Sequence, residues 1–347
     1  MNKIWYQGHP LRWLLLPLSW IFAGITCVRR TLFRLGITSQ TVMPIPVIIV
    51  GNITVGGSGK TPTVIYLIEL LRQHGFKPGV ISRGYGVDIQ GVKTVNLDAS
   101  AAEVGDEPAM IVARTQVPMV VGAKRVDTAN ALIAEFGVDV IICDDGLQHY
   151  ALARDIELVV IDGQRGLGNG LLLPAGPLRE GAWRLESVDF VLSNGGPAAK
   201  GQFEMQLVPT AVKPVKYDAK PNDYTFDKSQ PLVAMAGIGN PARFFEALRT
   251  QGYQLALSHG FDDHQAYDKA QLCDLAKDLP LLMTEKDAVK CRDFAQENWW
   301  YLAVDAKLPS QFDQQLLARL REVAAAKQGN FHGIRKKIVR YSGLPCV

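Results

Sequence analysis

The chain has 347 residues, of which 48% are hydrophobic and 20% charged, with 32 Gly and 19 Pro. This composition is typical of a globular protein and excludes a disordered, collagenous or low-complexity chain. At roughly 100–200 residues per domain, the length predicts two domains, or one large α/β domain with an appendage. The formal net charge is +3, yet residues 1–36 carry five Lys and Arg and no Asp or Glu. The remainder is therefore slightly acidic, which argues against nucleic-acid partners.

Five cysteines form no C-x-x-C pair and are an odd number in a long chain. Neither a disulfide framework nor a zinc site is therefore indicated. A reducing compartment is the simpler interpretation.

The N-terminal segment contains an uncharged, mostly apolar run, residues 13–28, that ends at Arg29 and Arg30. Its sixteen residues are short for a transmembrane helix, which needs about 20, and Pro17 weakens that interpretation further. A signal peptide fits poorly because arginines follow the run. We expect an interfacial helix whose aromatic side chains lie at headgroup depth and whose arginines contact anionic lipid on the cytoplasmic face. A buried core helix is the alternative.

Residues 46–51 are typical of a fully buried strand, and they lead through a glycine-rich turn into the helical apolar spacing of residues 63–72. Alternating strands and helices continue along the chain. Further strand-like runs lie at 79–82, 117–121, 138–143, 158–161 and 188–192, with helix-like stretches at 107–113 and 124–136. Near-continuous apolar strands that alternate with helices predict an α/β fold, P-loop NTPase-like, with a mostly parallel sheet covered by helices on both faces.

The pattern loosens between residues 203 and 230, where proline punctuates short polar pieces, and this predicts a linker or a small β-ribbon. A second alternation then predicts a smaller α/β lobe. Its strands are expected at 232–236, 253–257 and 281–284, and its helices at 241–251 and 311–325. The predicted division is an N-terminal membrane-associated helix, a P-loop nucleotide-binding core, a linker and a C-terminal lobe, at 1–36, 37–208, 209–230 and 231–347.

The strongest chemical signal is the stretch from Thr54 to Thr61, TVGGSGKT, which nearly satisfies the phosphate-loop pattern G-x-x-x-x-G-K-[ST] between a strand and a helix. Glycines let successive N–H groups point into one concavity, a lysine reaches the β- and γ-phosphates, and a hydroxyl serves Mg²⁺. The first position is Thr54 instead of Gly, which requires a negative φ there. The predicted nucleotide-binding residues are Thr54, Gly56, Gly57, Ser58, Gly59, Lys60 and Thr61. A glycine-rich turn without a ligand is the alternative.

A phosphate loop needs a carboxylate for Mg²⁺, usually at the end of a neighbouring apolar strand. Asp144 and Asp145 follow such a strand, and adjacent carboxylates repel each other unless a cation lies beside them. We therefore predict that Thr61, Asp144 and Asp145 serve the metal, although the sequence does not say which Asp acts directly. A turn-capping role for either Asp is the alternative.

Several motifs occur in a fixed order over most of the chain. They are Gly51-Asn52 with the loop, Ser82-Arg83-Gly84-Tyr85-Gly86, Gly105-Asp106-Glu107-Pro108, Asp144-Asp145-Gly146-Leu147-Gln148-His149, Leu173-Pro174-Ala175-Gly176-Pro177-Leu178-Arg179-Glu180, Asp263-His264 and Thr284-Glu285-Lys286-Asp287-Ala288. Together they resemble the tetraacyldisaccharide 4′-kinases, the lipid A 4′-kinase family of the bacterial inner membrane. The resemblance implies that ATP phosphorylates the 4′-hydroxyl of a tetraacyl glucosamine disaccharide 1-phosphate, the lipid A disaccharide precursor. It also implies that the N-terminal helix holds the chain, peripherally or as an anchor, on the cytoplasmic face of the inner membrane.

The resemblance also implies roles for individual residues. Asp106 and His264 match the catalytic pair of the family, Lys60 serves the nucleotide, and Arg125 matches an arginine expected near the γ-phosphate. The residues expected to bind the substrate are Tyr85, Glu107, Gln148, His149 and Arg179. Without the resemblance, Arg125 is a solvated residue that opens a helix, Asp106 lies at a helix N-terminus, and a lone His is structural.

Two other function classes are compatible with a phosphate loop. A switch GTPase or a metal-insertion ATPase would hydrolyse the nucleotide to exchange partners, and the sequence 284–287 superficially resembles its guanine-specific N/T-K-x-D motif. That stretch lacks the Asn-Lys-x-Asp form and lies in the second lobe. A membrane-bound scaffold that binds nucleotide without chemistry is the third possibility.

Overall fold

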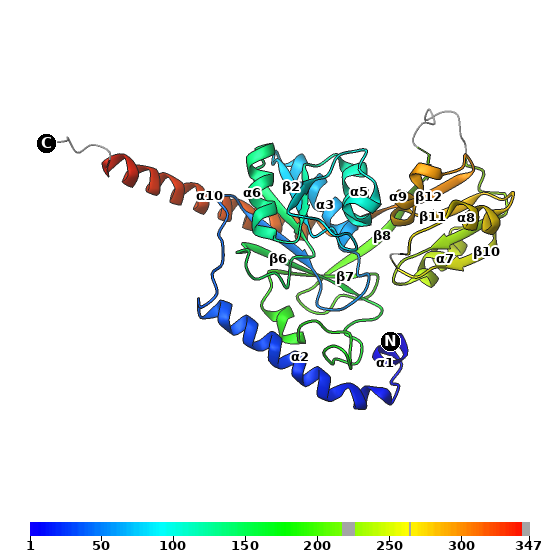
Figure 1. Cartoon of the computed structure of the whole chain (residues 1–347), viewed down its shortest axis with the longest axis horizontal. Helices are drawn as coiled ribbons and strands as arrows, with labels where there is room; N and C mark the ends of the chain where they lie inside the picture. The colour runs from blue at the N-terminus through cyan, green and yellow to red at the C-terminus, as the bar shows by residue number, and fades with distance from the viewer. Residues whose placement is uncertain (217–225, 264, 342–347) are drawn as a thin grey trace.

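The computed structural model describes residues 1–216, 226–263 and 265–341, the last helix beyond residue 329 only by its backbone. Its centre is a 12-stranded sheet in the order β10-β9-β11-β12-β8-β7-β6-β1-β5-β2-β4-β3 (Figure 1). The strands are β1 Val47–Gly51, β2 Pro78–Ser82, β3 Val92–Thr94, β4 Met119–Gly122, β5 Val140–Asp144, β6 Ile156–Asp162, β7 Phe190–Asn194, β8 Phe203–Pro214, β9 Leu232–Ala236, β10 Leu255–Gly260, β11 Leu281–Thr284 and β12 Trp299–Lys307.

Pairing is parallel throughout except at two places, where β3 lies antiparallel on β4 and β12 antiparallel on β8. The helices are α1 Asn2–Tyr6, α2 Leu11–Arg34, α3 Lys60–Gln73, α4 Ala101–Val104, α5 Asp106–Thr115, α6 Arg125–Phe136, α7 Pro241–Thr250, α8 Lys269–Ala276, α9 Glu285–Cys291 and α10 Ser310–Tyr341, with short 3-10 helices η1 Ala182–Glu186 and η2 Arg292–Phe294. The predicted α/β fold with a mostly parallel sheet is confirmed.

The central strands are buried because helices cover both faces of the sheet. On one face, α3 and α5 pack with the beginning of α10 over the even-numbered positions of β1, such as Ile48 and Val50. On the other, α6 contributes Ala129 and Leu132 against Val47. Fully burying an aliphatic side chain of this size contributes about 1.5–3 kcal/mol, so this two-sided packing is what holds the carboxyl ends of β1 and β5 in fixed positions.

The predicted linker 209–230 differs from the structure in its first part. Residues 209–214 belong to β8, which pairs with β7 at its beginning and with β12 along the rest of its length. This strand therefore joins the two halves of the sheet without a break. Residues 217–225 of the predicted linker lie outside the described residues.

The last helix, α10, also differs from its predicted place in the C-terminal lobe. Phe312, Leu316 and Leu320 are buried in the cluster that α3 and β1 form, and the Phe312 ring meets Phe190 of β7 edge to face. Lys327 then forms an ion pair of 2.8 Å with Asp155 just before β6. By its packing α10 belongs to the P-loop half, beyond which it projects (Figure 1).

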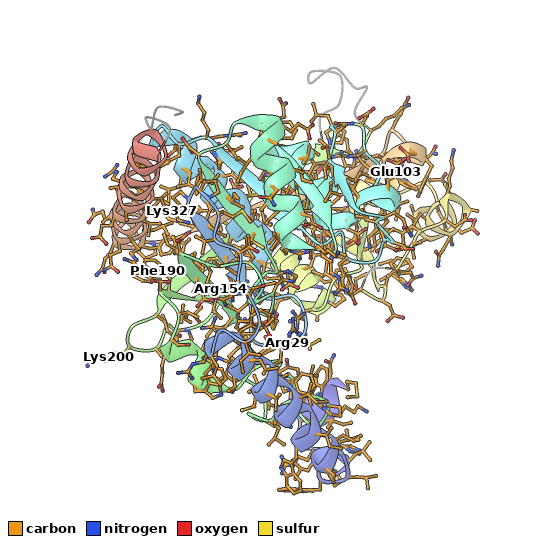
Figure 2. All side chains as sticks on the ribbon, turned by 60° about the vertical axis from the view of Figure 1, so that its left-hand side comes forward. Arg29, Glu103, Arg154, Phe190, Lys200 and Lys327 are labelled. Carbon is orange, nitrogen blue, oxygen red and sulfur yellow. The ribbon has the colours of Figure 1, made fainter. Side chains whose placement is uncertain are left out.

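Helix α2 runs beside the body and projects from it (Figure 2). It is 24 residues long, extends past both ends of the predicted run 13–28, and contains Pro17. Its length and composition allow it to cross a membrane, and only 6% of its most apolar window is buried. The alternative of a core helix is therefore wrong. The predicted N-terminal apolar helix is confirmed, and it is longer than the sequence indicates.

Candidate active site

The glycine-rich loop connects the carboxyl end of β1 to α3. Gly59 has a φ of 101° and directly precedes Lys60, the first residue of the helix. A Cβ at Gly59 would lie 2.5 Å from Asn194 Nδ2, so this position also needs glycine for space. Thr54 lies in an extended bridge with Leu178, which accommodates a threonine at the first position of the pattern. The loop thus has the geometry that exposes backbone N–H groups to a phosphate.

Asp145 lies at the centre of the cationic side of the site. It adopts the left-handed region with a φ of 48°, directly after β5. Its carboxylate lies 3.5 Å from Lys60 Nζ and 3.2 Å from an Arg179 guanidinium nitrogen. Burial by itself raises the pKa of Asp145, but the charges of Lys60 and Arg179 outweigh it and hold the pKa below its usual value. Two predicted residues from distant segments, Lys60 and Arg179, are therefore brought together by the predicted Asp145.

Asp144 lies beside it in the opposite electrostatic environment. The residue is fully buried at the end of β5, and among the described residues its Oδ1 has no hydrogen-bond partner. Burial, with the negative charges of Glu107 and Asp145 added, raises the pKa of Asp144 to about 7. A bound cation would therefore stabilise the Asp144 carboxylate more than the Asp145 carboxylate, since Asp145 already pairs with Lys60 and Arg179. Of the predicted metal-binding residues, Asp144 is the carboxylate with a partnerless oxygen, and a metal there would take most of its other oxygens from phosphate and water.

A cavity of about 270 Å³ lies between the glycine-rich loop and the second half of the sheet. Its charged and polar lining includes Lys60, Glu107, Asp162, Asn194 and Lys286. An apolar side is formed by Met110, Leu207, Pro209, Phe244, Leu302 and Val304. A cavity that combines apolar side chains with a glycine-rich loop fits a nucleotide, whose base is flat and whose phosphates are charged.

The wall opposite the loop is formed by α9. Lys286 Nζ lies 3.1 Å from Asp263 and 3.6 Å from Glu107 of α5. One turn later, Lys290 Nζ lies 3.5 Å from Asp106 and 3.6 Å from the fully buried Asp287. The stretch that superficially resembles a guanine-binding motif thus folds as the start of a helix that contacts α5. Asp106 and Glu107, both predicted site residues, begin α5 at this contact.

Ten of the predicted residues that the structure describes do not line the cavity. Six of them, Thr54, Gly56, Asp106, Asp144, Asp145 and Arg179, take part in the loop and the contacts described above, and four do not. Arg125 is buried and donates to the carbonyl oxygens of Gly122, at 3.0 Å, and Asp144, at 3.5 Å. Tyr85 is 64% exposed, and Gln148 donates to the Asn52 carbonyl at 3.1 Å. The fourth residue, His149, is half-buried, and its ring lies near the charges of several arginines, of which Arg125 has the largest effect. His264, the predicted partner of Asp106, lies outside the described residues.

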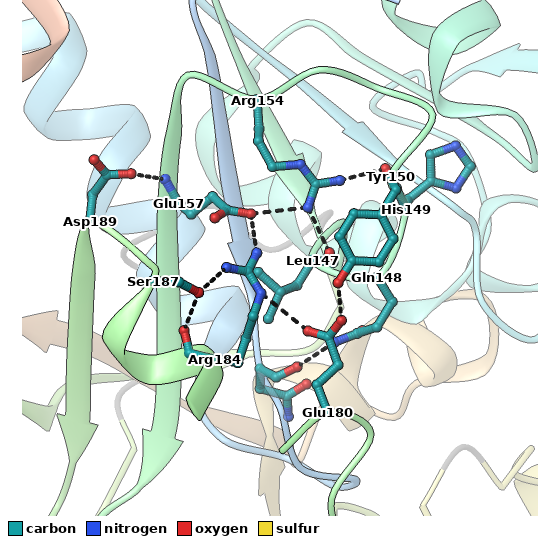
Figure 3. Close-up of polar contacts among 11 residues, drawn as sticks. Leu147, Gln148, His149, Tyr150, Arg154, Glu157, Glu180, Arg184, Ser187 and Asp189 are labelled. Atoms are coloured by element: carbon teal, nitrogen blue, oxygen red, sulfur yellow. Dashed lines mark hydrogen bonds and ion pairs between the residues drawn. The ribbon is translucent and has the colours of Figure 1, made fainter. Parts of the chain in front are cut away.

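Sequence reasoning missed a buried network that supports the site (Figure 3). Arg184 lies between Glu157 and Glu180, and both acids are buried with it. Arg154 donates at 2.7 Å to the carbonyl oxygens of Leu147 and His149. The network therefore holds both the turn that follows Asp145 and the residue that follows Arg179. The missed Asn194, at the carboxyl end of β7, donates to the Ser58 carbonyl at 2.9 Å, and its place at a strand end is the signal that could have found it.

This arrangement of strand, glycine-rich loop, lysine and paired carboxylates defines an α/β phosphotransferase of the P-loop type. Residues 11–321 match the family described as LpxK, Tetraacyldisaccharide-1-P 4'-kinase. The chain belongs to this family, whose kinases act in lipid A biosynthesis. The family predicted from the motifs and the predicted kinase activity are confirmed, and the alternatives of a switch GTPase, a metal-insertion ATPase or a scaffold are set aside.

Individual relatives agree with this assignment. The chain is 88% identical over 335 residues to Tetraacyldisaccharide 4'-kinase of Shewanella baltica (strain OS185), which covers 96% of this chain and 99% of the relative. It is 77% identical to the protein of that name from Shewanella sp. (strain W3-18-1), with the same coverage. The crystal structure of LpxK from Aquifex aeolicus in complex with ATP superimposes with a TM-score of 0.75 at 29% identity, covering 89% of this chain and 99% of that one.

Proposed function

We propose that this site transfers the γ-phosphate of ATP to the 4′-hydroxyl of a tetraacyl disaccharide 1-phosphate. In this reaction the bond between the γ-phosphorus and the bridging oxygen of ADP breaks, and a bond from the 4′ oxygen to the same phosphorus forms. The observation that supports it most directly is the convergence of Lys60 and Arg179 on Asp145 at the glycine-rich loop. Two cations beside that loop would stabilise a phosphoryl group in transfer.

The nucleotide would lie in the cavity with its phosphates over residues 57–61. The lining supports this placement, because it combines Lys60 and the loop glycines with apolar side chains such as Phe244 and Leu207. On binding, the phosphates would compete with Asp145 for Lys60. A weak pair at 3.5 Å can be exchanged for stronger charge-assisted bonds to phosphate oxygens.

Mg²⁺ would be held by Asp144 and Thr61 together with phosphate oxygens. The described residues contain no group of three or more His, Cys, Asp and Glu side chains arranged for a metal. Mg²⁺ does not need such a group, since it is usually bound through one or two carboxylates and keeps several waters. The partnerless Oδ1 of Asp144 supports its choice over Asp145. The ion would supply charge neutralisation between the β- and γ-phosphates.

The proton of the 4′-hydroxyl would pass to the pair of Asp106 and His264. The described part of the site supports only the position of Asp106, at the N-terminus of α5 and 3.5 Å from Lys290. A base of this kind contributes about 10²–10⁴-fold. If the two residues share one step, Asp106→Ala and His264→Ala should each lower kcat by a similar factor, and the double variant should be scarcely worse. Additive losses would separate the two residues.

The deciding experiment follows ³²P from γ-labelled ATP to a lipid disaccharide by thin-layer chromatography. A labelled lipid that appears with the wild type and disappears with the site variants supports the proposal. Release of free phosphate without a labelled lipid would instead show a nucleotide hydrolase. Binding of ATP without any labelled product would show a scaffold.

We also propose that residues 1–36 hold the chain on the cytoplasmic face of the inner membrane, beside a P-loop core and a smaller C-terminal lobe. Trp13, Leu14 and Trp20 of α2 are each more than 60% exposed, which is costly in water and favourable in lipid. Basic side chains near a charged bilayer contribute about 1 kcal/mol each. Removing Arg29, Arg30 and Arg34 should therefore weaken flotation with anionic vesicles.

Added salt should have the same effect on the unaltered chain because it screens these charges. The matched control neutralises three exposed cations of the body, Lys93, Lys228 and Arg249, and should float normally. Flotation that is insensitive to both the arginine changes and salt would indicate a true membrane span or no membrane role.

A further inference from the structure

The segment between β6 and η1, residues 163–180, carries Arg179 to the phosphate side of the site, and we call it the Arg179 loop. Its end is fixed to the strand that leads into the glycine-rich loop. Arg179 N donates to the Ile53 carbonyl at 2.7 Å, and Val55 N donates to the Pro177 carbonyl at 2.9 Å. The side chain of Arg179 then reaches Asp145. A displacement of this loop would therefore move Arg179 relative to Asp145 and Lys60.

The opposite side of the Arg179 loop is fixed by Ser19 of α2. Ser19 is 4% exposed and is the buried residue of this helix. Its Oγ donates to the Leu172 carbonyl at 2.9 Å and accepts from Ala175 N at 3.0 Å. The hydroxyl thus makes two hydrogen bonds to a loop more than 150 residues away in the sequence, and its contact with the Leu15 carbonyl of its own helix is longer, at 3.4 Å. Ser19 therefore stabilises the Arg179 loop more than it stabilises its own apolar and largely exposed helix.

Helix α1 fixes the same part of the loop a second time. Trp5 is 9% exposed, its Nε1 donates to the Pro174 carbonyl at 3.0 Å, and its own carbonyl accepts from Asn169 N at 2.9 Å. Asn169 in turn donates to the Ala175 carbonyl at 2.9 Å. Contacts from two separate helices therefore converge on residues 172–175 of the Arg179 loop.

We propose that Ser19 and Trp5 are positioning residues that hold the Arg179 loop against the glycine-rich loop. The N-terminal helices are then a supporting part of the active site as well as the segment that meets lipid. This inference rests on the proposed role of Arg179 at the transferred phosphate. Its physical basis is that removing the Ser19 hydroxyl leaves the buried Ala175 N–H and the part-buried Leu172 carbonyl without this partner, so the loop loses its fixed position.

The test compares hydroxyl removal at two positions of α2. Ser19→Ala removes the contacts to the loop, whereas Thr26→Ala is the matched control because the Thr26 hydroxyl bonds only to Phe22 and Ala23 of its own helix. Trp5→Phe is the second variant, which keeps an aromatic ring and loses the N–H, and Trp20→Phe, at a side chain that is 68% exposed, is its control. The full-length proteins are assayed in detergent with both substrates saturating, so that membrane affinity does not limit the rate.

We expect Ser19→Ala and Trp5→Phe to lower kcat about tenfold while the KM for ATP changes less than twofold, since a small misplacement of a catalytic group costs rate more than binding. Amide hydrogen exchange should become faster within residues 163–180 and stay unchanged in β1 and β5. Flotation with vesicles should equal that of the wild type. Thr26→Ala should behave as wild type in all three measurements, and Trp20→Phe should do so in kcat and in hydrogen exchange.

Three results would overturn the proposal. The first is wild-type kcat and wild-type exchange in both variants. The second is a rate loss that disappears in detergent and follows vesicle binding, which would leave the helices only an anchoring role. The third is faster exchange throughout the core, which would show a general loss of stability. If Arg179→Ala keeps full kcat, the proposed role of Arg179 fails, and exchange in residues 163–180 still decides whether Ser19 and Trp5 hold the loop.

Discussion

The two walls of the cavity differ in how completely their polar groups are paired. On the side of the glycine-rich loop and of the neighbouring carboxyl ends of β1 and β5, which we call the first wall, Ser58 Oγ and Asp144 Oδ1 are buried and have no hydrogen-bond partner among the described residues. On the α9 wall, the buried Asp287 accepts from Gly237 N at 3.0 Å and from the Tyr267 hydroxyl at 2.7 Å. Lys286 there is shared between two carboxylates.

This difference indicates which wall is expected to bind a ligand. A buried polar atom without a partner costs about 1–3 kcal/mol, so partnerless atoms that cluster around a glycine-rich loop are expected to meet their partners in a bound nucleotide and its metal. The charges on the α9 wall are satisfied within the protein. We therefore expect substitutions on the first wall to affect the rate of transfer and those on the α9 wall to affect the assembly of the cavity.

Lys60→Ala should have the largest effect. Lys60 has Asp145 as its ion-pair partner in the free protein, and in the proposed reaction it would follow the transferring phosphoryl group. Its loss should lower kcat by about 10³-fold, the size expected for a charge that stabilises the transition state. Steady-state transfer of labelled phosphate measures the effect, with Lys200→Ala, an exposed lysine, as the control. Near-normal turnover in a folded Lys60→Ala protein would remove the glycine-rich loop from the mechanism.

Asp144→Asn should separate function from stability. We expect kcat to fall about 10²-fold because the proposed Mg²⁺ ligand is weakened, while the free protein becomes roughly 1–2 kcal/mol more stable at pH 8 because a neutral amide replaces a fully buried carboxylate. Denaturant unfolding and transfer kinetics measure the two effects. Asp145→Asn provides the contrast, since it loses its pairs with Lys60 and Arg179 and should be destabilised. A destabilised Asp144→Asn protein would show that Asp144 is already compensated.

The contrast between Asp144 and Asp145 also shows how much of the site the sequence alone predicts. The glycine-rich loop and the Asp pair are evident because their residue types and spacing are local. Which Asp is paired depends on Arg179, whose approach to Asp145 results from tertiary structure that no local pattern encodes. The network of Arg184 and Glu157 was missed for the same reason, because its members are common residues without a distinctive spacing.

The fold shows a similar division. The strands β1 and β5 are evident because all five residues of each are buried and almost all are apolar. In contrast, β8 alternates half-buried and exposed residues and contains prolines, so it was predicted as a linker or a ribbon. Helix α10 follows the second lobe in sequence, and only the packing of Phe312 and Leu316 shows that it returns to the P-loop half.

Lys286→Met should have a smaller effect than either substitution on the first wall. Its side chain joins α9 to Glu107 of α5, so its loss should loosen the cavity and raise the KM for ATP about fivefold, with kcat reduced less than that. Lys269→Met, at an exposed lysine of the same lobe, is the control and should leave both constants unchanged. A loss of kcat as large as that of Lys60→Ala would contradict the distinction between the two walls.

The smallest effect is expected at His149. Like Asp144 on the first wall, His149 lies where nearby charges of one sign are not fully compensated. Burial and the nearby charges of Arg125, Arg29, Arg154 and Arg83 lower the pKa of His149 to about 4. The folded protein therefore keeps this ring neutral over a pH range in which the unfolded chain protonates it. The contribution of His149 to stability is fully present above pH 6.5 and is lost as the pH falls from about 6.5 towards 4.

Because the ring is only half-buried, we expect a loss of about 1 kcal/mol over this range, after allowance for screening by solvent and salt. Urea unfolding between pH 7 and pH 4.5 should show it in the wild type and not in His149→Gln. Arg29→Gln, which removes one of the exposed charges near the ring, should reduce the loss without abolishing it, and so should 0.5 M salt. Equal pH dependence in the wild type and in His149→Gln would show that other groups neutralise the arginines, and the contrast in charge pairing would then be confined to the two walls of the cavity.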